Sequence, residues 1–237
     1  MKNRLVILGS GTCNLVPEKA AASVLIELNG MRLIYDFGRG IATRTTEVDL
    51  KQDDVEHIFI SHFHPDHLSD LDPYLQAASW SQIDVRNKDI NIYGPPGTKS
   101  FLKKMFAVFE WGKIGRDFAI NIHDIKGGEL SIMGQHLGVV DLHHSHGLRF
   151  GQYAIAGDAD VNDDLIALLK GTKIAIFDSG HITDKEIVDI AVQTQAQTLV
   201  CSHQYRSLNE ERLNIDAKTK GFKGQLVVAH DLMEFML

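Results

Sequence analysis

The sequence has few cysteines, no long apolar run and a deficit of positive charge, and each shortage excludes a class of protein. Cys13 and Cys201 are the only cysteines in 237 residues, which excludes a disulfide framework and favours packing or incidental thiols. No apolar stretch approaches the roughly 20 residues that span a bilayer. The first apolar run, residues 4–8, is also too short for a signal-peptide core. We therefore expect a cytoplasmic protein with no membrane partner.

The charge balance argues against one class of ligand. The net charge is −7, from 24 Lys and Arg against 31 Asp and Glu. Proteins that hold duplex nucleic acid neutralise many phosphates, so duplex nucleic acid is not an expected partner. Small anions stay compatible, because two divalent ions at a site would make the local field positive. Length and ordinary globular composition predict one domain over residues 1–237.

Short apolar and β-branched runs alternate with helical patterns along the chain. The runs predict ten strands, at 4–8, 23–28, 32–35, 57–60, 90–93, 137–140, 153–156, 173–177, 197–201 and 225–229. Residues 98–110 have apolar side chains at helical spacing. Asn162 is a candidate helix cap, and capping boxes begin at Thr183 and Ser207. Strands with interspersed helices predict an α/β or α+β fold.

Six of the apolar runs end in Asp or His at, or just past, their last residue. These ends are Asp36, His62, the 141–144 segment, Asp158, Asp178 and His203. Metal ligands and general acids favour such positions, because the rigid sheet fixes the backbone while loops leave room for substrate. Any single instance could be a turn residue, but six together favour a shared site. Ile60-Ser61-His62 also resembles Cys201-Ser202-His203, which weakly suggests two similar halves.

The segment 62–67, His-Phe-His-Pro-Asp-His, places three imidazoles and one carboxylate directly after a predicted strand. His62 and His64 alternate by two, so at an extended strand end they project to the same side and can bind one ion. Pro65 forces the chain out of the strand and lets Asp66 and His67 turn toward a second ion. These ligand types suit zinc first, with manganese or iron as competitors.

The pattern His-x-His-x-Asp-His at 62–67 resembles the signature of the metallo-β-lactamase superfamily. Further motifs resemble its ribonuclease Z-like branch, which includes small phosphodiesterases. They are Gly9-Ser10-Gly11-Thr12, Tyr35-Asp36-Phe37-Gly38, Gly94-Pro95-Pro96-Gly97-Thr98 and Gly157-Asp158. The resemblance implies a four-layer αββα sandwich with two divalent metal ions.

The resemblance also implies a set of ligands. The first ion would take His62, His64 and a later histidine, and the second would take Asp66, His67 and His203. Asp158 would bridge the two ions, since Asp160 lies beyond the strand exit. Three histidines compete as the later ligand: His143, His144 and His146. The family's His-Ser pattern favours His144, and the others would then orient ligands or face substrate.

Other residues receive roles by resemblance or position. Gly180-His181-Ile182-Thr183 looks like an element of ribonuclease Z in which the histidine assists phosphoryl chemistry, so His181 is a candidate general acid. Asp36 resembles a carboxylate that orients the metal ligands, with a plain strand-end carboxylate as the alternative. Tyr205 and Arg206 are candidates for phosphate contact, although a solvated turn is the favoured interpretation. His57, His123, His136 and His230 are interpreted as structural or surface residues.

Taken together, the resemblance implies a phosphodiesterase that acts through a metal-bridging hydroxide, with Asp66 and His181 as catalytic residues. Only residues 145–157 separate His144 from Asp158, so the tRNA-binding arm of ribonuclease Z is missing and a small or short substrate is favoured. Hydrolysis of a thioester, lactone or other acyl group by the same centre is one alternative. A non-catalytic metal-binding module is another, and a di-iron redox role is disfavoured because related oxidoreductases carry Glu at the position of His64. A homodimer is compatible with the sequence.

Overall fold

A computed structural model describes residues 2–110 and 117–237 and divides the chain into two compact units. Unit 1 is formed by Met1–Gly9, Ala20–Lys126 and Leu232–Leu237, and unit 2 by Ser10–Lys19 and Gly127–Asp231. Each unit has its own seven-stranded sheet and its own apolar cluster between sheet and helices. The sequence predicted a single domain over residues 1–237, and this stays a prediction.

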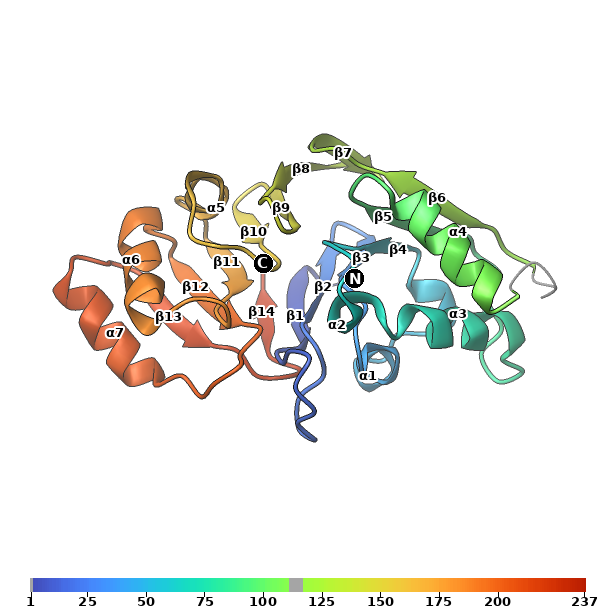
Figure 1. The fold of residues 1–237 in the computed structure, drawn as a ribbon, viewed down its shortest axis with the longest axis horizontal. Helices are drawn as coiled ribbons and strands as arrows, with labels where there is room; N and C mark the ends of the chain where they lie inside the picture. The colour runs from blue at the N-terminus through green and yellow to red at the C-terminus, as the bar shows by residue number, and fades with distance from the viewer. Residues whose placement is uncertain (1, 111–116) are drawn as a thin grey trace. The chain divides into compact units, whose positions relative to one another are not determined.

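Unit 1 contains a mixed sheet whose strands lie in the order β14-β1-β2-β3-β4-β5-β6 (Figure 1). The strands are β1 (Arg4–Gly9), β2 (Ser23–Leu28), β3 (Met31–Tyr35), β4 (His57–Phe59), β5 (Ile90–Gly94), β6 (Ile120–Asp124) and β14 (Glu234–Met236). Pairing is antiparallel from β14 to β3 and parallel from β3 to β6. Parallel strands need crossover connections, and helices supply them.

The helices of unit 1 bury one face of this sheet. They are α1 (Ile41–Glu47), α2 (Pro65–Leu68), α3 (Leu71–Trp80) and α4 (Thr98–Val108), with a 3-10 turn at Gln52–Asp54. Alternate strand residues such as Ile34, Ile58 and Ile92 join Leu75 and Leu102 from the helices in one buried cluster. The helices thereby fix the parallel strands, and with them the loops at the strand ends.

Unit 2 repeats this plan with the strand order β13-β12-β11-β10-β9-β8-β7. The strands are β7 (Gly128–Ile132), β8 (Gln135–Asp141), β9 (His146–Phe150), β10 (Tyr153–Ile155), β11 (Ile174–Asp178), β12 (Thr198–Ser202) and β13 (Gln225–Val228). The helices are α5 (Asp163–Leu169), α6 (Asp184–Thr194) and α7 (Glu210–Thr219). Pairing is antiparallel from β7 to β10 and parallel from β10 to β13.

The suggested similarity of two halves is present in this topology, since each sheet begins as an antiparallel meander and continues with three further parallel strands. The two Ser-His pairs nevertheless occupy different places in it. Ser61-His62 follows β4, the first strand after the antiparallel part of its sheet. Ser202 ends β12, the second such strand of its sheet, and His203 follows it. The matching tripeptides are therefore not equivalent positions of a repeat.

The structure confirms the ten predicted strands, with ends that shift by a residue or two, and the helix predicted at 98–110. Two predicted caps are confirmed: Asn162 accepts the amide of Leu165, and Thr183 forms a capping box with Glu186. The capping box expected at Ser207 is wrong. Asn209 caps that helix, and the Glu210 carboxylate accepts the amide of Val228 instead.

In the part of the chain that the structure describes, four strands and three α-helices were not predicted. The missed strands β6, β7, β9 and β14 are short, and several of their residues are polar or exposed, so they lack the apolar signal of a buried strand. Within the described ranges, no helix is long and apolar enough to cross a bilayer. Cys201 is buried in the core of unit 2, where burial raises the pKa of its thiol, and Cys13 is exposed.

Candidate metal and catalytic site

The predicted histidine segment lies in unit 1, between β4 and α2. His64 occupies the N-cap position of α2 without a side-chain capping hydrogen bond, and Pro65 occupies the first turn, where its missing N–H has no partner to lose. The ring centroid of His62 lies 4.5 Å from that of His64 and 4.2 Å from that of His67. The three imidazoles therefore form one compact group. Asp66 lies beside His67 on α2. Pro65 ends the extended segment as expected.

A buried carboxylate at the end of β3 orients this group. Asp36 is 1% exposed and accepts hydrogen bonds from the Ser61 amide (2.7 Å) and the Ser61 hydroxyl (2.8 Å). Its Oδ2 also lies 2.7 Å from Nδ1 of His67, and Ser61 Oγ lies 3.0 Å from Nδ1 of His62. Because the Ser61 hydroxyl donates its proton to Asp36, its oxygen can accept the Nδ1–H of His62. His67 donates its own Nδ1–H to Asp36. This arrangement makes Nε2 the nitrogen that can coordinate an ion.

The backbone around Asp36 is shaped for this contact. Asp36 has a left-handed conformation (φ 60°), which Asp adopts more readily than most residues. Two residues later, a Cβ on Gly38 would lie 1.7 Å from the carbonyl oxygen of Asp66. Only glycine allows the loop after β3 to lie directly against α2. The Asp36-Phe37-Gly38 motif therefore positions the histidine group from the end of β3, the strand next to β4.

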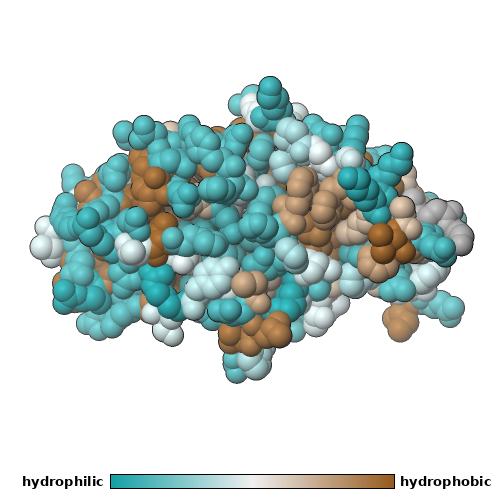
Figure 2. Space-filling view, viewed as in Figure 1, coloured by the Kyte–Doolittle hydropathy of each residue, from teal (hydrophilic) through white to brown (hydrophobic). Residues whose placement is uncertain are grey.

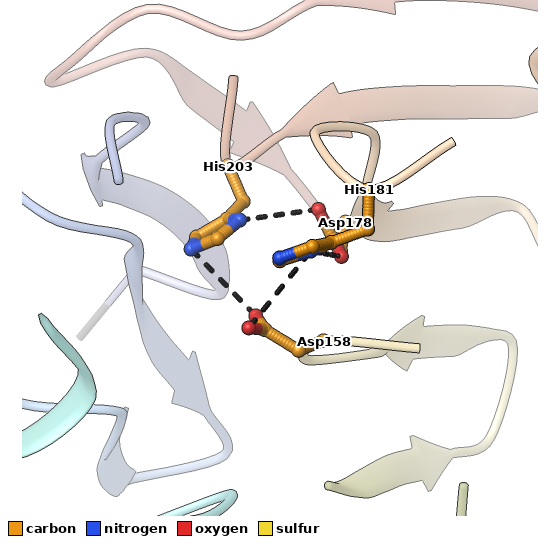
Figure 3. Close-up of side chains that lie close together, drawn as sticks. All are labelled: Asp158, Asp178, His181 and His203. Atoms are coloured by element: carbon orange, nitrogen blue, oxygen red, sulfur yellow. Dashed lines mark hydrogen bonds and ion pairs between the residues drawn. The ribbon is translucent and has the colours of Figure 1, made fainter. Parts of the chain in front are cut away.

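A second group of titratable side chains lies in unit 2, at the ends of β10, β11 and β12 (Figure 3). Asp178 Oδ2 lies 2.6 Å from Nδ1 of His181, and its Oδ1 lies 3.1 Å from Nδ1 of His203. Asp158 faces the same two imidazoles, with its Oδ1 3.6 Å from Nε2 of His203 and its Oδ2 3.9 Å from Nδ1 of His181. The potential ligand atoms of these four residues lie close enough together to bind one cation.

The charges of this second group are set by the buried carboxylate. Burial by itself raises the pKa of Asp178, but the hydrogen bonds with His181 and His203 outweigh it, and the pKa is lowered. The hydrogen bond that His181 donates to Asp178 raises the pKa of His181 against the opposing effect of burial. His181 is therefore biased toward the protonated imidazolium, the form that a general acid requires.

A glycine permits this packing too. A Cβ on Gly180 would lie 2.2 Å from the carbonyl oxygen of His203 and 2.6 Å from the Tyr205 ring. The loop after β11 thus runs against the loop after β12, which brings the His181 and His203 rings to 5.3 Å. This close approach requires a glycine at position 180 of the Gly180-His181 motif. His203 itself is left-handed at φ 51°.

The three competing histidines of the 143–146 segment differ in their surroundings. His144 has a side chain that is 64% exposed, and its Nε2 lies 3.2 Å from the exposed carboxylate of Asp160. His143 lies 3.6 Å from Asp164, also at the surface. His146, the first residue of β9, is 6% exposed, and burial lowers the pKa of its imidazole. His146 is therefore held in the neutral form that a metal ion binds.

The chemistry of both groups fits divalent metal ions. Imidazoles whose Nδ1 bonds to a carboxylate, beside further carboxylates, form the usual combination of metal ligands and the residues that orient them. Donor atoms of this kind occur on His62, His64, Asp66 and His67 in unit 1. In unit 2, those of Asp158, Asp178, His181 and His203 all lie within 4.8 Å of one another. Unit 2 thus contains a group that could hold a metal ion, and the assignment of the individual ligands stays a prediction.

The sequence analysis gave no role to two residues that hold the site histidines. Ser61 links His62 to Asp36, and Asp178 holds both His181 and His203. Asp178 was visible as one of the six strand ends, and the motif Asp178-Ser179-Gly180-His181 could have drawn attention to it. Arg206 donates to Asp184 (2.6 Å) and to the Ser179 carbonyl (3.3 Å), so it ties the His181 loop to α6. Phosphate contact by Arg206 stays a prediction.

Comparison with known proteins gives a consistent picture. The family model described as "Beta-lactamase superfamily domain" matches residues 34–209. Ribonuclease Z of Pyrococcus horikoshii is 29% identical over 124 residues, which are 52% of this chain and 38% of that protein. Ribonuclease Z of Methanococcus aeolicus is 30% identical over 122 residues, 52% of this chain and 36% of that protein. The matched stretch thus spans less than two-fifths of these curated relatives.

Solved structures share the fold over nearly the whole chain. A diphosphatase of the PhnP family has a TM-score of 0.77 at 21% identity and covers 100% of this chain and 98% of its own. YhfI of Bacillus subtilis, a metallo-β-lactamase fold protein, has a TM-score of 0.80 at 17% identity, with 98% of both chains covered. Human tRNase Z, short form, has a TM-score of 0.72 at 20% identity, again with 98% of both covered. The predicted α/β fold class of the metallo-β-lactamase type is confirmed.

The hydrogen bonds of Asp36 lead to a prediction about metal affinity. Asp36→Asn replaces a carboxyl group that accepts three hydrogen bonds by an amide with a single acceptor oxygen, and it should loosen His62 and His67 together. We expect metal affinity to fall about 10- to 100-fold, measured by competition with a chromophoric chelator. Asp124→Asn is the matched control, since Asp124 is also a strand-end carboxylate but is exposed. Equal affinity of Asp36→Asn and the native protein would contradict the orienting role.

Proposed function

Because the chain belongs to the beta-lactamase superfamily, we propose that it is a metal-dependent hydrolase whose substrate is a small or short phosphodiester. One observation carries the proposal. Both units present imidazoles at strand ends, and in each unit a buried carboxylate holds them through Nδ1. Such buried, oriented groups are costly to maintain in a protein that uses them only for folding.

The proposed metal ligands are the residues predicted from the sequence, with one change. They are His62, His64, Asp66, His67, Asp158 and His203, together with a histidine of the 143–146 segment. We favour His146 over His144 for the last position, because His146 is buried and neutral whereas His144 pairs with Asp160 at the surface. Two divalent ions, zinc first, would lower the pKa of a water molecule and neutralise charge on the phosphate oxygens.

The chain's own residues would divide the remaining work. His181 would donate a proton to the leaving oxygen from Nε2, while Asp178 holds its Nδ1 and favours the protonated ring. His181 is part-exposed, with a side chain 39% accessible, so a substrate oxygen can reach it. Asp66, which lies beside His67 on α2, would help to orient the attacking group.

The short segment between His146 and Asp158 bears on the size of the substrate. β9 and β10 occupy the residues between His146 and Asp158, so no extended arm is inserted there. The net charge of −7 also disfavours a long polyanion. The ribonuclease Z relatives act on RNA by name, and the diphosphatase neighbour on a phosphoanhydride. Hydrolysis at a phosphorus centre is the chemistry that these names have in common, and it supports the proposed reaction type.

The first test measures metal and activity on one sample. We expect about two metal ions per chain, and hydrolysis of bis(p-nitrophenyl) phosphate or a cyclic nucleotide that is faster than hydrolysis of a thioester or a lactone. Removing the metal with a chelator should abolish turnover, and zinc or manganese should restore it. An acyl substrate preferred over every phosphodiester would overturn the proposal, and two bound ions without any turnover would indicate a metal-binding module.

The second test concerns the proposed general acid. His181→Ala should keep both ions, because the proposed ligands remain, but should lose rate according to the leaving group. We expect a loss of about 100-fold or more for an alkoxide leaving group and a much smaller loss for p-nitrophenolate, which needs little protonation. His136→Ala, at an exposed position of β8, serves as control. Loss of metal from His181→Ala would make His181 a ligand and refute the acid role.

The third test separates the competing histidines. His146→Ala should lower the metal content or affinity, whereas His144→Ala should leave both within about twofold of the native protein. The two variants are matched, because they remove the same side chain two residues apart in one loop. Metal content by plasma emission spectrometry decides between them. The reverse result would restore His144 as the ligand.

A further inference from the structure

His64 differs from His62 and His67 in how its ring is held. The His62 ring is hydrogen-bonded to Ser61 Oγ. The His67 ring is hydrogen-bonded to Asp36, and both of these rings are buried. His64 is exposed, and within the described ranges no hydrogen bond or ion pair holds its side chain, which contacts the His62 ring edge to face at 4.5 Å. The position of His64 therefore depends on the backbone that carries it.

An aromatic stack restrains the backbone next to His64. The Phe63 and Phe101 rings are parallel to within 8°, at an interplanar angle of 6°, and their centroids lie 4.8 Å apart. His64 has an extended backbone (φ −67°, ψ 144°), and in an extended segment neighbouring side chains point to opposite sides. Phe63 therefore points away from the two imidazoles that flank it. The stack can hold the chain between His62 and His64 without engaging their nitrogen atoms.

Phe101 is carried by α4, and this helix is anchored in the core of unit 1. Thr98 is 0% exposed and Leu102 2%, and Leu102 belongs to the buried apolar cluster of the unit. The Thr98 hydroxyl also donates to the Pro95 carbonyl (2.7 Å) at the start of the helix. Phe101 is thus held by a buried helix, whereas Phe63 belongs to the loop between β4 and α2.

The two rings pack at the edge of this cluster, near the surface of unit 1. Both are half-buried and lie against the cluster. In Figure 2, brown and tan atoms lie at the surface in the area where Figure 1 places α2 and α4. The turn that begins α4 lies beside the same ring, since a Cβ on Gly97 would lie 4.0 Å from Cε2 of Phe63. Phe63 is therefore supported by the beginning of α4 as well as by Phe101.

The degree of order of a ligand before binding affects how tightly it holds an ion. A histidine on a mobile loop loses conformational entropy when an ion fixes it, and this loss weakens binding. Hydrogen bonds to Ser61 and Asp36 reduce the loss for His62 and His67. For His64 the corresponding restraint is packing, because two stacked rings favour one relative position of the backbones that carry them.

We infer that Phe101 is a positioning residue for His64, on which it acts through the Phe63 ring. The inference rests on the proposed metal-dependent function, in which His64 binds an ion. Phe101 itself would contact neither the ion nor the substrate. It would fix the backbone on which His64 is mounted, so that the exposed imidazole is already in place when the ion binds.

The first experiment removes the stack and measures the zinc affinity of the full-length protein by competition with a chromophoric chelator. Phe101→Leu keeps an apolar side chain but loses the ring, so we expect zinc affinity to fall about tenfold. Phe63→Leu removes the other ring of the pair and should give the same loss. Phe101→Tyr should keep the native affinity, because the ring remains.

Phe106→Leu is the matched control for a general loss of packing. Phe106 lies on the same helix and packs against the same cluster, whereas the ring stacked on Phe63 is that of Phe101. The control should leave zinc affinity within about twofold of the native value. Urea unfolding of the metal-free variants checks that Phe101→Leu and Phe106→Leu lose similar stability.

A double-mutant cycle tests whether Phe101 acts through His64. In a His64→Ala background the positioned ligand is gone, so adding Phe101→Leu should change zinc affinity by less than about twofold. In a His67→Ala background His64 remains, so Phe101→Leu should still lower the affinity about tenfold. A merely structural role of Phe101 would weaken zinc binding equally in both backgrounds.

The outcomes separate this inference from the proposed function. Native zinc affinity in Phe101→Leu, or an equal loss in both histidine backgrounds, would overturn the positioning role alone. A loss that disappears only with His64→Ala would support the role, even in a protein that turns over no phosphodiester. A native protein that binds no zinc would refute the proposed metal-dependent function and this inference with it.

Discussion

The site residues depend on one kind of interaction, the hydrogen bond between a buried carboxylate and Nδ1 of an imidazole. Asp36 orients His67 directly and His62 through Ser61, and Asp178 orients His181 and His203. A buried carboxylate is costly unless it is fully hydrogen-bonded, so each histidine stabilises the carboxylate as much as the carboxylate holds the ring. This mutual dependence fixes which nitrogen of each imidazole can act on another group.

Strand ends are the natural place for such pairs, because adjacent parallel strands deliver their last residues side by side. Asp36 follows β3 while Ser61 and His62 follow the neighbouring β4, and Asp178 ends β11 while His203 follows the neighbouring β12. The loops then need a close approach that a side chain would prevent. Gly38 and Gly180 each provide it, one in each unit, by letting a loop backbone lie against a neighbouring carbonyl oxygen.

The two units share a topology, but their buried carboxylates hold histidines from different kinds of segment. In unit 1 the carboxylate serves imidazoles of a single six-residue segment, so the local sequence already contains the donors. In unit 2 the carboxylate joins residues from two separate loops, and one of these, His181, is partly exposed with a raised pKa. In the proposed mechanism, unit 1 would therefore supply metal donors, whereas unit 2 would combine metal donors with the general acid His181.

The sequence by itself determined those features whose signal is local. The donor spacing from His62 to His67, the ten apolar strands and the helix caps at Asn162 and Thr183 depend on neighbouring residues alone, so their patterns could be read directly. Tertiary structure decided what depends on burial and pairing. The pairing of β8 with β9 sets Asp141 opposite His146 and returns the Leu142 amide to the Ser145 carbonyl, which buries His146 and leaves His144 in solvent. No spacing rule distinguishes two histidines that lie two residues apart in one turn. Likewise, Asp178 gained its role only because β11 and β12 are adjacent, a contact between residues 25 positions apart.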